Sequence, residues 1–214
     1  MNKSQNYEAT LPEHYRQVYR LDATDKKTGL VMNLLAFIPL VPVMGGAVLA
    51  LFLAGAELSF DTVKYFFCLV GLLLSLVLYM VLHELVHGAA YKALTGQKLS
   101  FGLKWSCAFC GVPHIFTYRK TAMIAVIAPF AVFSLLLGGL TVVLLFVDPL
   151  VFLFSALLFS IHFGGCVGDL YLFFLLLFKY KSGKLLMKDT GPEMTLYLPA
   201  DEAESFPTIT KKDV

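Results

Sequence analysis

The chain has 214 residues, of which 58% are hydrophobic and 15% are charged, and its formal net charge is +2. Charged residues make up about a quarter of an ordinary soluble domain, so this composition excludes an ordinary soluble domain. The small net charge gives no electrostatic basis for binding a nucleic acid. We therefore expect an integral membrane protein that contacts the lipid bilayer and binds no nucleic acid.

The first 28 residues are polar and contain no apolar core, which argues against a cleaved signal peptide. Within them, Leu11, Tyr15, Val18 and Tyr19 recur at helical spacing and share one face. We predict that residues 1–28 form a cytoplasmic N-terminal tail with a short amphipathic helix at the membrane surface.

Four long segments contain almost no charge, and each has the roughly 20 apolar residues that a membrane-spanning helix needs. They are Leu30–Ala54, Tyr65–Tyr91, Thr121–Val147 and Pro149–Phe178. The sequence thus predicts an all-α integral membrane protein with four transmembrane helices. Pro39 and Pro42 predict a kink or an interruption in the first of them.

The segment between the second and third apolar segments predicts a short β-hairpin on the cytoplasmic side. Apolar residues alternate with polar or small ones over Leu99–Ser106, which is typical of a half-buried strand. We expect a turn near Cys110–Pro113 and a returning strand at Ile115–Tyr118. Residues 180–214 are expected to be a polar, partly disordered cytoplasmic tail, with a short strand at Met194–Leu198.

The positive charges predict the orientation in the membrane. Five Lys or Arg precede Leu30, five lie between the second and third segments, and six follow Phe178, so 16 of the 17 lie on one side. The positive-inside rule makes that side cytoplasmic. We therefore expect a multi-pass protein of the cell membrane with both termini in the cytoplasm.

The second apolar segment contains the motif His83-Glu84-Leu85-Val86-His87. Two histidines four apart share one face of a helix, so both can bind one Zn²⁺. Glu84 can then take a proton from the zinc-bound water, as in H-E-x-x-H metallopeptidases. The alternative is a buried membrane histidine beside a glutamate that reaches the interface.

Such a site needs a third protein ligand, and Asp169 is the only formal charge in the fourth segment. His83 lies nine residues before Lys92 and Asp169 ten before Lys179, so both are about 14 Å from the cytoplasmic end at 1.5 Å per residue. The small residues Ser160, Gly164, Gly165 and Gly168 favour a close approach of the two helices. We predict Asp169 as the third ligand; the alternative is a salt bridge or hydrogen bond within the helix bundle.

The remaining candidates are weaker. His114, in the expected hairpin turn, could line the site or bind the metal if the hairpin folds inward. His162 lies two turns before Asp169 and is expected to be a buried histidine with hydrogen-bond partners, or an oxyanion stabiliser. Asp148, before Pro149, is expected to begin a helix, and Asp189 is expected to be solvated in the tail.

Cys107 and Cys110 have the spacing of a metal site, but no second pair completes one. In a reducing compartment a structural disulfide is also unfavourable. We expect two small, partly buried residues of the hairpin, with zinc binding or redox chemistry as the alternative.

The motif helix, the hairpin, Ala128-Pro129 and Gly165-Cys-Val-Gly-Asp169 together resemble the DUF3267 zincin peptidase family over roughly Thr62–Thr190. These bacterial membrane proteins are similar to intramembrane metalloproteases of the site-2 protease type. The resemblance implies zinc ligation by His83, His87 and Asp169 and a catalytic base at Glu84. It also implies that the hairpin presents an unwound substrate. Gly-Asp-Leu here replaces the usual Asp-Gly context of the third ligand.

Together these features predict a membrane-embedded zinc metallopeptidase domain at residues 29–179. We expect a zinc-dependent intramembrane endopeptidase that cleaves membrane proteins or membrane peptides in or near their transmembrane segments. The alternative is a non-catalytic, zinc-stabilised membrane scaffold or partner-binding protein. A transporter is a third possibility, but no inverted repeat supports it.

Overall fold

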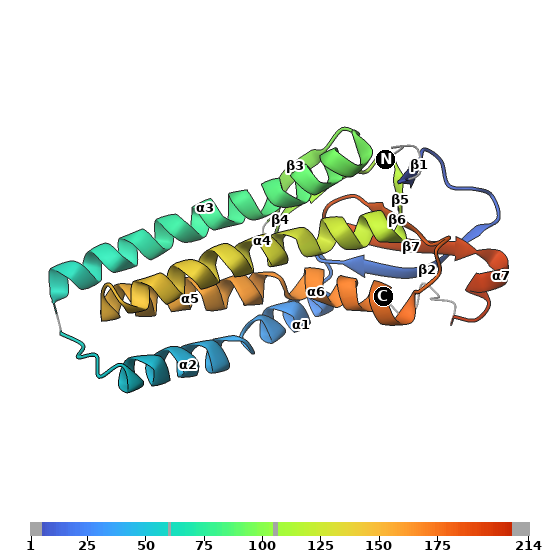
Figure 1. Cartoon of the computed structure of the whole chain (residues 1–214). Helices are drawn as coiled ribbons and strands as arrows, with labels where there is room; N and C mark the ends of the chain where they lie inside the picture. Colours follow the sequence, from blue (N-terminus) through green and yellow to red (C-terminus); the bar gives the residue numbers. More distant parts are fainter. Residues whose placement is uncertain (1–5, 60, 105–106, 207–214) are drawn as a thin grey trace. The chain divides into compact units, whose positions relative to one another are not determined.

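The structure, a computed structural model, describes residues 6–59, 61–104 and 107–206. The chain divides into two compact units. The first, the sheet unit, comprises Met1–Gly29, Glu84–Ala128 and Leu170–Val214, and the second, the helical unit, comprises Leu30–His83 and Pro129–Asp169. Figure 1 labels the elements of both units.

The helices follow the apolar segments of the sequence. They are α1 (Lys26–Ala36), α2 (Leu40–Leu53), α3 (Thr62–Thr95), α4 (Arg119–Leu145), α5 (Pro149–Gly165), α6 (Val167–Phe174) and α7 (Ala200–Ala203), with a π-helical segment at Leu175–Lys179. The expected interruption of the first apolar segment is confirmed, since α1 ends at Ala36 and Pro39 is the N-cap of α2. Proline lacks the N–H that would continue the hydrogen-bond ladder of α1.

The helical unit has its core between α2 and α5. Ala47 and Leu51 of α2 pack against Phe152 and Ala156 of α5, and all four are buried. The expected helix start at Asp148 is confirmed, because its carboxylate accepts hydrogen bonds from the N–H groups of the first turn of α5. Asp148 also forms an ion pair with Lys64, in the first turn of α3.

The prediction of four transmembrane helices is wrong. Within the described residues, three stretches are long and apolar enough to cross a membrane: Lys26–Leu53, Thr62–Thr95 and Arg119–Leu145. The expected fourth helix is broken at Cys166, and its halves, Pro149–Gly165 and Val167–Lys179, pass the same test only together and are bent by 44°. Apolar composition alone did not reveal this break.

The all-α prediction is also wrong, because the sheet unit contains a five-stranded antiparallel sheet of order β1-β5-β6-β7-β2 and a two-stranded sheet β3-β4. The strands are β1 (Tyr7–Glu8), β2 (Tyr15–Asp22), β3 (Ser100–Lys104), β4 (Cys107–Gly111), β5 (Phe116–Tyr118), β6 (Leu186–Asp189) and β7 (Glu193–Pro199). They are short, and β1, β2 and β5 pair with strands far away in the sequence. Local patterns therefore indicate single strands but not the sheet that they form.

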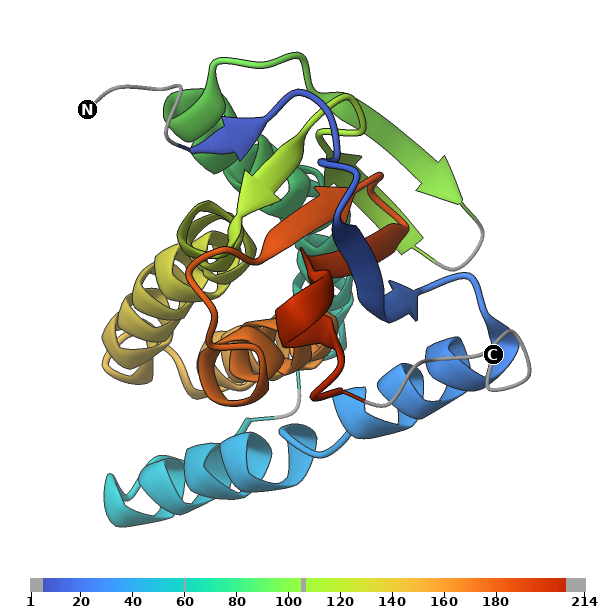
Figure 2. The same ribbon diagram turned by 90° about the vertical axis from the view of Figure 1, so that its right-hand side faces the viewer.

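The predicted N-terminal amphipathic helix is wrong, since Tyr15, Val18 and Tyr19 of its expected apolar face belong to β2. This strand pairs with β7, from Tyr15 opposite Pro199 to Asp22 opposite Glu193. Figure 2 shows the blue N-terminal strand beside the red C-terminal strands. The short strand expected at Met194–Leu198 is confirmed as the centre of β7. The two expected tails therefore pair with each other instead of remaining separate.

The expected β-hairpin exists, but with a different second strand. β3 pairs with β4, with Ser100 opposite Gly111 and Lys104 opposite Cys107. We had expected a turn near Cys110–Pro113, but its first two residues belong to β4. The predicted returning strand became β5, which lies between β1 and β6 in the larger sheet. Residues 105–106, at the end of the predicted first strand, lie outside the described residues. β4 is nearer to β3 in sequence than β5 is, so its pairing closes a shorter loop.

Gly111 lies where β4 meets the β6–β7 turn, and Gly111→Ala is expected to destabilise the protein. A Cβ at this position would lie 2.4 Å from the backbone nitrogen of Gly191 and 3.0 Å from the Asp189 carbonyl oxygen. Backbone atoms cannot rotate away as a side-chain end can, so we expect a loss of about 1–3 kcal/mol, typical of overpacking. Thermal unfolding in detergent measures the loss.

The matched control is Gly183→Ala in the same unit, where an added Cβ meets nothing within 4 Å. Its unfolding temperature should equal that of the wild type. Equal unfolding temperatures for the two variants would contradict the close approach of β4 to the β6–β7 turn.

Candidate metal centre

Helix α3 carries both histidines of the motif. Its 34 residues run from Thr62 to Thr95 without an internal proline, so His83 and His87 lie one turn apart on one face. Their exposed fractions are only 7% and 8%. Two buried imidazoles on an apolar helix are costly without partners, and both have them.

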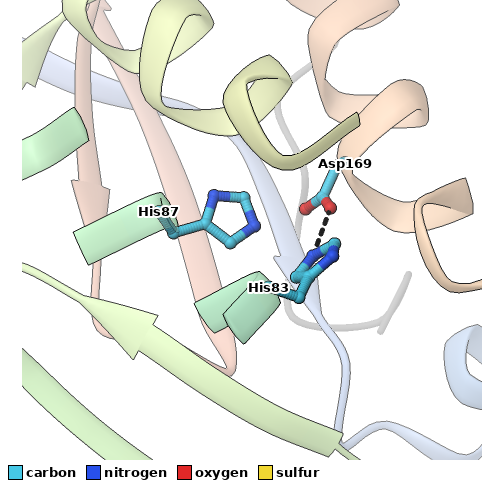
Figure 3. A group of neighbouring side chains, drawn as sticks. All are labelled: His83, His87 and Asp169. Carbon is cyan, nitrogen blue, oxygen red and sulfur yellow. Dashed lines mark hydrogen bonds and ion pairs between the residues drawn. The ribbon is translucent and has the colours of Figure 1, made fainter. Parts of the chain in front are cut away.

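Asp169 lies in the first turn of α6, just after the break at Cys166. Its Oδ2 atom is 3.2 Å from Nε2 of His83. Figure 3 shows this contact as a dashed line, with the His87 ring pointing toward the other two side chains. The break in the helix and the approach of Asp169 to α3 thus occur at the same place in the chain.

One ligand atom from each of His83, His87 and Asp169 lies within 4.8 Å of the other two. Across the described residues, no other group of three or more His, Cys, Asp or Glu side chains has this property. Two imidazole nitrogens and one carboxylate oxygen form a donor set typical of catalytic zinc sites, which leave one position open. The residues therefore fit a Zn²⁺ ion, and ligation by each of them stays a prediction.

The hydrogen bond of His87 defines which of its nitrogens can bind a metal. Its Nδ1 lies 2.9 Å from the carbonyl oxygen of Ala125 on α4. A carbonyl only accepts, so Nδ1 carries the proton and Nε2 keeps the lone pair. A backbone carbonyl is a common partner for a metal-binding histidine, because it sets the tautomer and the ring orientation.

Tyr79, which the sequence reasoning missed, is the partner of the other histidine. Its hydroxyl oxygen lies 3.0 Å from Nδ1 of His83, whereas Asp169 contacts Nε2 of the same ring. One signal could have indicated it. Tyr79, His83, His87 and Tyr91 follow one another at intervals of four on an otherwise apolar helix, and residues so spaced share a face.

Glu84 follows His83 on α3 and is partly buried. Burial raises the pKa of the Cys110 thiol on β4 to about 12, and the negative charges of Asp189 and Glu84 add to the rise. The Glu84 carboxylate is thus close enough to the Cys110 thiol to disfavour its negatively charged form. Its role as catalytic base stays a prediction.

His162 is the buried histidine with hydrogen-bond partners that the sequence predicts. It is fully buried in α5, and its nitrogens face the Tyr79 hydroxyl at 2.9 Å and the Ser134 hydroxyl at 3.1 Å. His114 lies in an exposed turn and does not belong to the three-residue group.

The prediction that Asp189 is solvated is wrong. Its exposed fraction is 2%, and it accepts hydrogen bonds from the Tyr91 hydroxyl at 2.6 Å and the Gly191 N–H at 2.8 Å. Tyr91 precedes it by almost 100 residues, so the contact depends on tertiary structure. Asp189 thereby ties the β6–β7 turn to the C-terminal part of α3.

Cys110 is a buried free cysteine, in agreement with its expected place in the hairpin. The side chain of Cys107, the other half of the pair, lies outside the described residues.

Comparison with known families agrees with this geometry. The model of the family DUF3267, described as "Putative zincin peptidase", matches residues 76–184. This match covers about half of the chain, which therefore belongs to the DUF3267 family. Zincins are zinc peptidases that use the H-E-x-x-H motif, so the family implies zinc. No curated protein and no solved structure matches the chain.

Proposed function

We propose that this chain is a zinc-dependent intramembrane endopeptidase, which hydrolyses peptide bonds in or near transmembrane segments. One observation carries the proposal: two imidazoles and a carboxylate lie within 4.8 Å of one another in a buried group. Both histidines belong to α3, a helix long and apolar enough to cross a membrane. Membership of a family of zincins supports peptide hydrolysis as the reaction.

The position of the motif along α3 supports cleavage near one face of the membrane. Between Lys64 and Glu84 the helix has 19 residues without a formal charge, or about 28 Å at 1.5 Å per residue. That length nearly equals the roughly 30 Å of the hydrocarbon layer. If Lys64 marks one boundary, the metal centre lies close to the other, where water for hydrolysis is at hand.

The reaction needs few groups from the protein. A bound Zn²⁺ would polarise the scissile carbonyl and lower the pKa of water. Glu84 takes the proton from the water that attacks the carbonyl carbon, and it returns this proton to the amine as the C–N bond breaks. His83, His87 and Asp169 would hold the ion, a set of three protein ligands typical of catalytic zinc sites.

The β3–β4 hairpin suits an extended substrate. A peptide bond inside a helix is shielded by its own hydrogen bonds, so a substrate must unwind before it is cleaved. β3 has β4 as its partner strand, and its apolar Phe101 and Leu103 are exposed by 49% and 72%. A strand with one partner can accept another extended chain along its second edge. This supports the similarity to site-2 proteases.

The lysine and arginine distribution supports a cell-membrane location with both termini in the cytoplasm. The hairpin and the cytoplasmic end of α3 then lie on the same side. Substrates on this proposal are membrane proteins or membrane peptides.

The test of the proposal first identifies a substrate and then removes the metal. Membrane proteomes of cells with the wild type and with Glu84→Gln are compared. A membrane protein that accumulates in the variant becomes the substrate for the purified enzyme. A chelator such as 1,10-phenanthroline should stop its cleavage, and added Zn²⁺ should restore it. Zinc at 100 times its Kd should also stabilise the fold by about 2.7 kcal/mol.

Three results would contradict the proposal. Cleavage that persists at full rate in metal-free protein would exclude a zinc mechanism. If the chelator lowers the unfolding temperature but no membrane protein accumulates in the variant cells, zinc has only a scaffold role. Absence of zinc from the purified protein would count against both functions.

A further inference from the structure

A series of hydrogen-bonding groups extends from His83 away from Asp169, entirely within the helical unit. The hydroxyl of Tyr79 lies 3.0 Å from Nδ1 of His83 and 2.9 Å from Nδ1 of His162. Nε2 of His162 lies 3.1 Å from the hydroxyl of Ser134. The series links α3, α5 and α4 in that order. Apart from His83, none of its members belongs to the group of possible metal ligands.

The number of protons limits how this series can be arranged. His83 can bind a metal through Nε2, the nitrogen that faces Asp169, only if Nδ1 carries its proton. Nδ1 then donates to Tyr79. The single hydroxyl hydrogen of Tyr79 is left to donate to Nδ1 of His162, so His162 carries its own proton on Nε2 and donates to Ser134. Within the series, Tyr79 and His162 then each donate once and accept once.

The opposite arrangement prevents metal binding. If Tyr79 donates to Nδ1 of His83, the proton of a neutral His83 lies on Nε2, which then has no lone pair for a metal. His162 favours the productive arrangement because its Nδ1 competes for the Tyr79 hydrogen. The Cys166 thiol, 3.6 Å from the same nitrogen, is a further weak donor to it.

Aromatic packing holds these groups in place. The Tyr79 ring lies edge-on to the Phe133 ring at 5.2 Å between centroids, and the His162 ring is stacked near Phe130 at 5.9 Å and Phe159 at 6.2 Å. In such apolar surroundings hydrogen bonds are stronger than in water, and neighbouring bonds polarise one another.

We infer that Tyr79 and His162 are positioning residues, which keep the proton of His83 on Nδ1 and so prepare its Nε2 for Zn²⁺. This inference rests on the proposed zinc site, and it gives a reason for the partial or full burial of the polar side chains of Tyr79 and His162 among apolar helices: they raise zinc affinity. Partners of metal-bound histidines typically change metal affinity about 10–100-fold when they are removed.

The test measures Zn²⁺ affinity of the purified full chain in detergent by competition with a chelating dye. Tyr79→Phe removes one oxygen and keeps the ring against Phe133, and we expect its affinity for zinc to fall at least about tenfold. His162→Leu should weaken zinc binding as well, although His162 touches no ligand atom except through Tyr79. Ser134→Ala removes only the last hydroxyl and should have a smaller effect in the same direction.

The zinc affinity of the double variant Tyr79→Phe/His162→Leu distinguishes one shared effect on His83 from two independent effects. If both residues act through the one bond to His83, the double variant binds zinc no more weakly than Tyr79→Phe alone. Thermal unfolding of the metal-free proteins gives the second readout. A purely structural role would lower the unfolding temperature of the metal-free protein and leave its zinc affinity unchanged.

Tyr65→Phe is the matched control, because it removes the same atom from the same helix at a position that is 48% exposed. Its zinc affinity should equal that of the wild type. The inference is overturned if Tyr79→Phe or His162→Leu binds zinc within about twofold of the wild type, close to the error of such comparisons. If the wild type itself binds no zinc, the proposed function fails, and this inference fails with it. If the wild type binds zinc and the two variants bind it equally well, only this inference fails.

Discussion

Glu84→Gln is expected to abolish peptide cleavage while the protein keeps its zinc. Glutamine has nearly the same size as glutamate but cannot take a proton from water at neutral pH. Loss of a general base typically lowers the rate about 10²–10⁴-fold. Because Glu84 does not belong to the three-residue group, the zinc content should stay at the wild-type value. Cleavage of the accumulated membrane protein and elemental analysis of the same preparation measure the two quantities.

Glu57→Gln provides the control for this experiment. Glu57 is an exposed glutamate in the segment before α3, and the same substitution there should change neither cleavage nor zinc. Full cleavage by Glu84→Gln would refute the proposed mechanism. Loss of zinc from this variant would instead show that Glu84 helps to hold the metal.

Asp169→Ala is expected to lose most of its bound zinc. The variant removes the only carboxylate of the group and leaves two imidazoles, too few for a stable zinc site. Since even the outer partners of ligands affect affinity about 10–100-fold, loss of the ligand itself should lower affinity by more than about 100-fold. Zinc stoichiometry and competition with a chelating dye measure this loss.

Two further variants make the result specific. Asp169→Asn keeps the size of the side chain and one carbonyl oxygen, so its affinity should lie between those of the wild type and Asp169→Ala. Asp148→Ala removes the same type of residue from the N-cap of α5, where it should lower stability and leave zinc binding intact. Wild-type zinc affinity in Asp169→Ala would exclude Asp169 as a ligand.

The histidine motif could be predicted from the sequence because its geometry is local. Any helix places residues four apart on one face, and an uncharged stretch of this length is helical in a membrane. Asp169 could be singled out because a lone charge in an apolar segment is costly and therefore expected to have a partner. Its distance to His83, however, comes from the break at Cys166, which composition did not indicate.

The roles of Tyr79 and Asp189 became clear only in the folded chain, for a different reason. The spacing of four could place Tyr79 on the face of the two histidines, but only the structure shows that its hydroxyl faces both His83 and His162. Asp189 lies in a polar segment that looked solvated. It is buried because Tyr91 and the β6–β7 turn enclose it. The contact with Gly191 is local, but nothing in the neighbouring sequence indicates the contact with Tyr91.

The sequence by itself determined the apolar helices, the position of the H-E-x-x-H motif and the candidate ligands, since helix periodicity and the cost of buried charge depend on nearby residues. Only the tertiary structure decided that residues 15–22 form a strand. Their apolar residues recur at helical spacing, but pairing with β7, more than 170 residues later, favoured the extended form. Strand pairing and helix breaks depend on distant partners, which explains why the sheet, the bend at Cys166 and the surroundings of His83 emerged only from the folded chain.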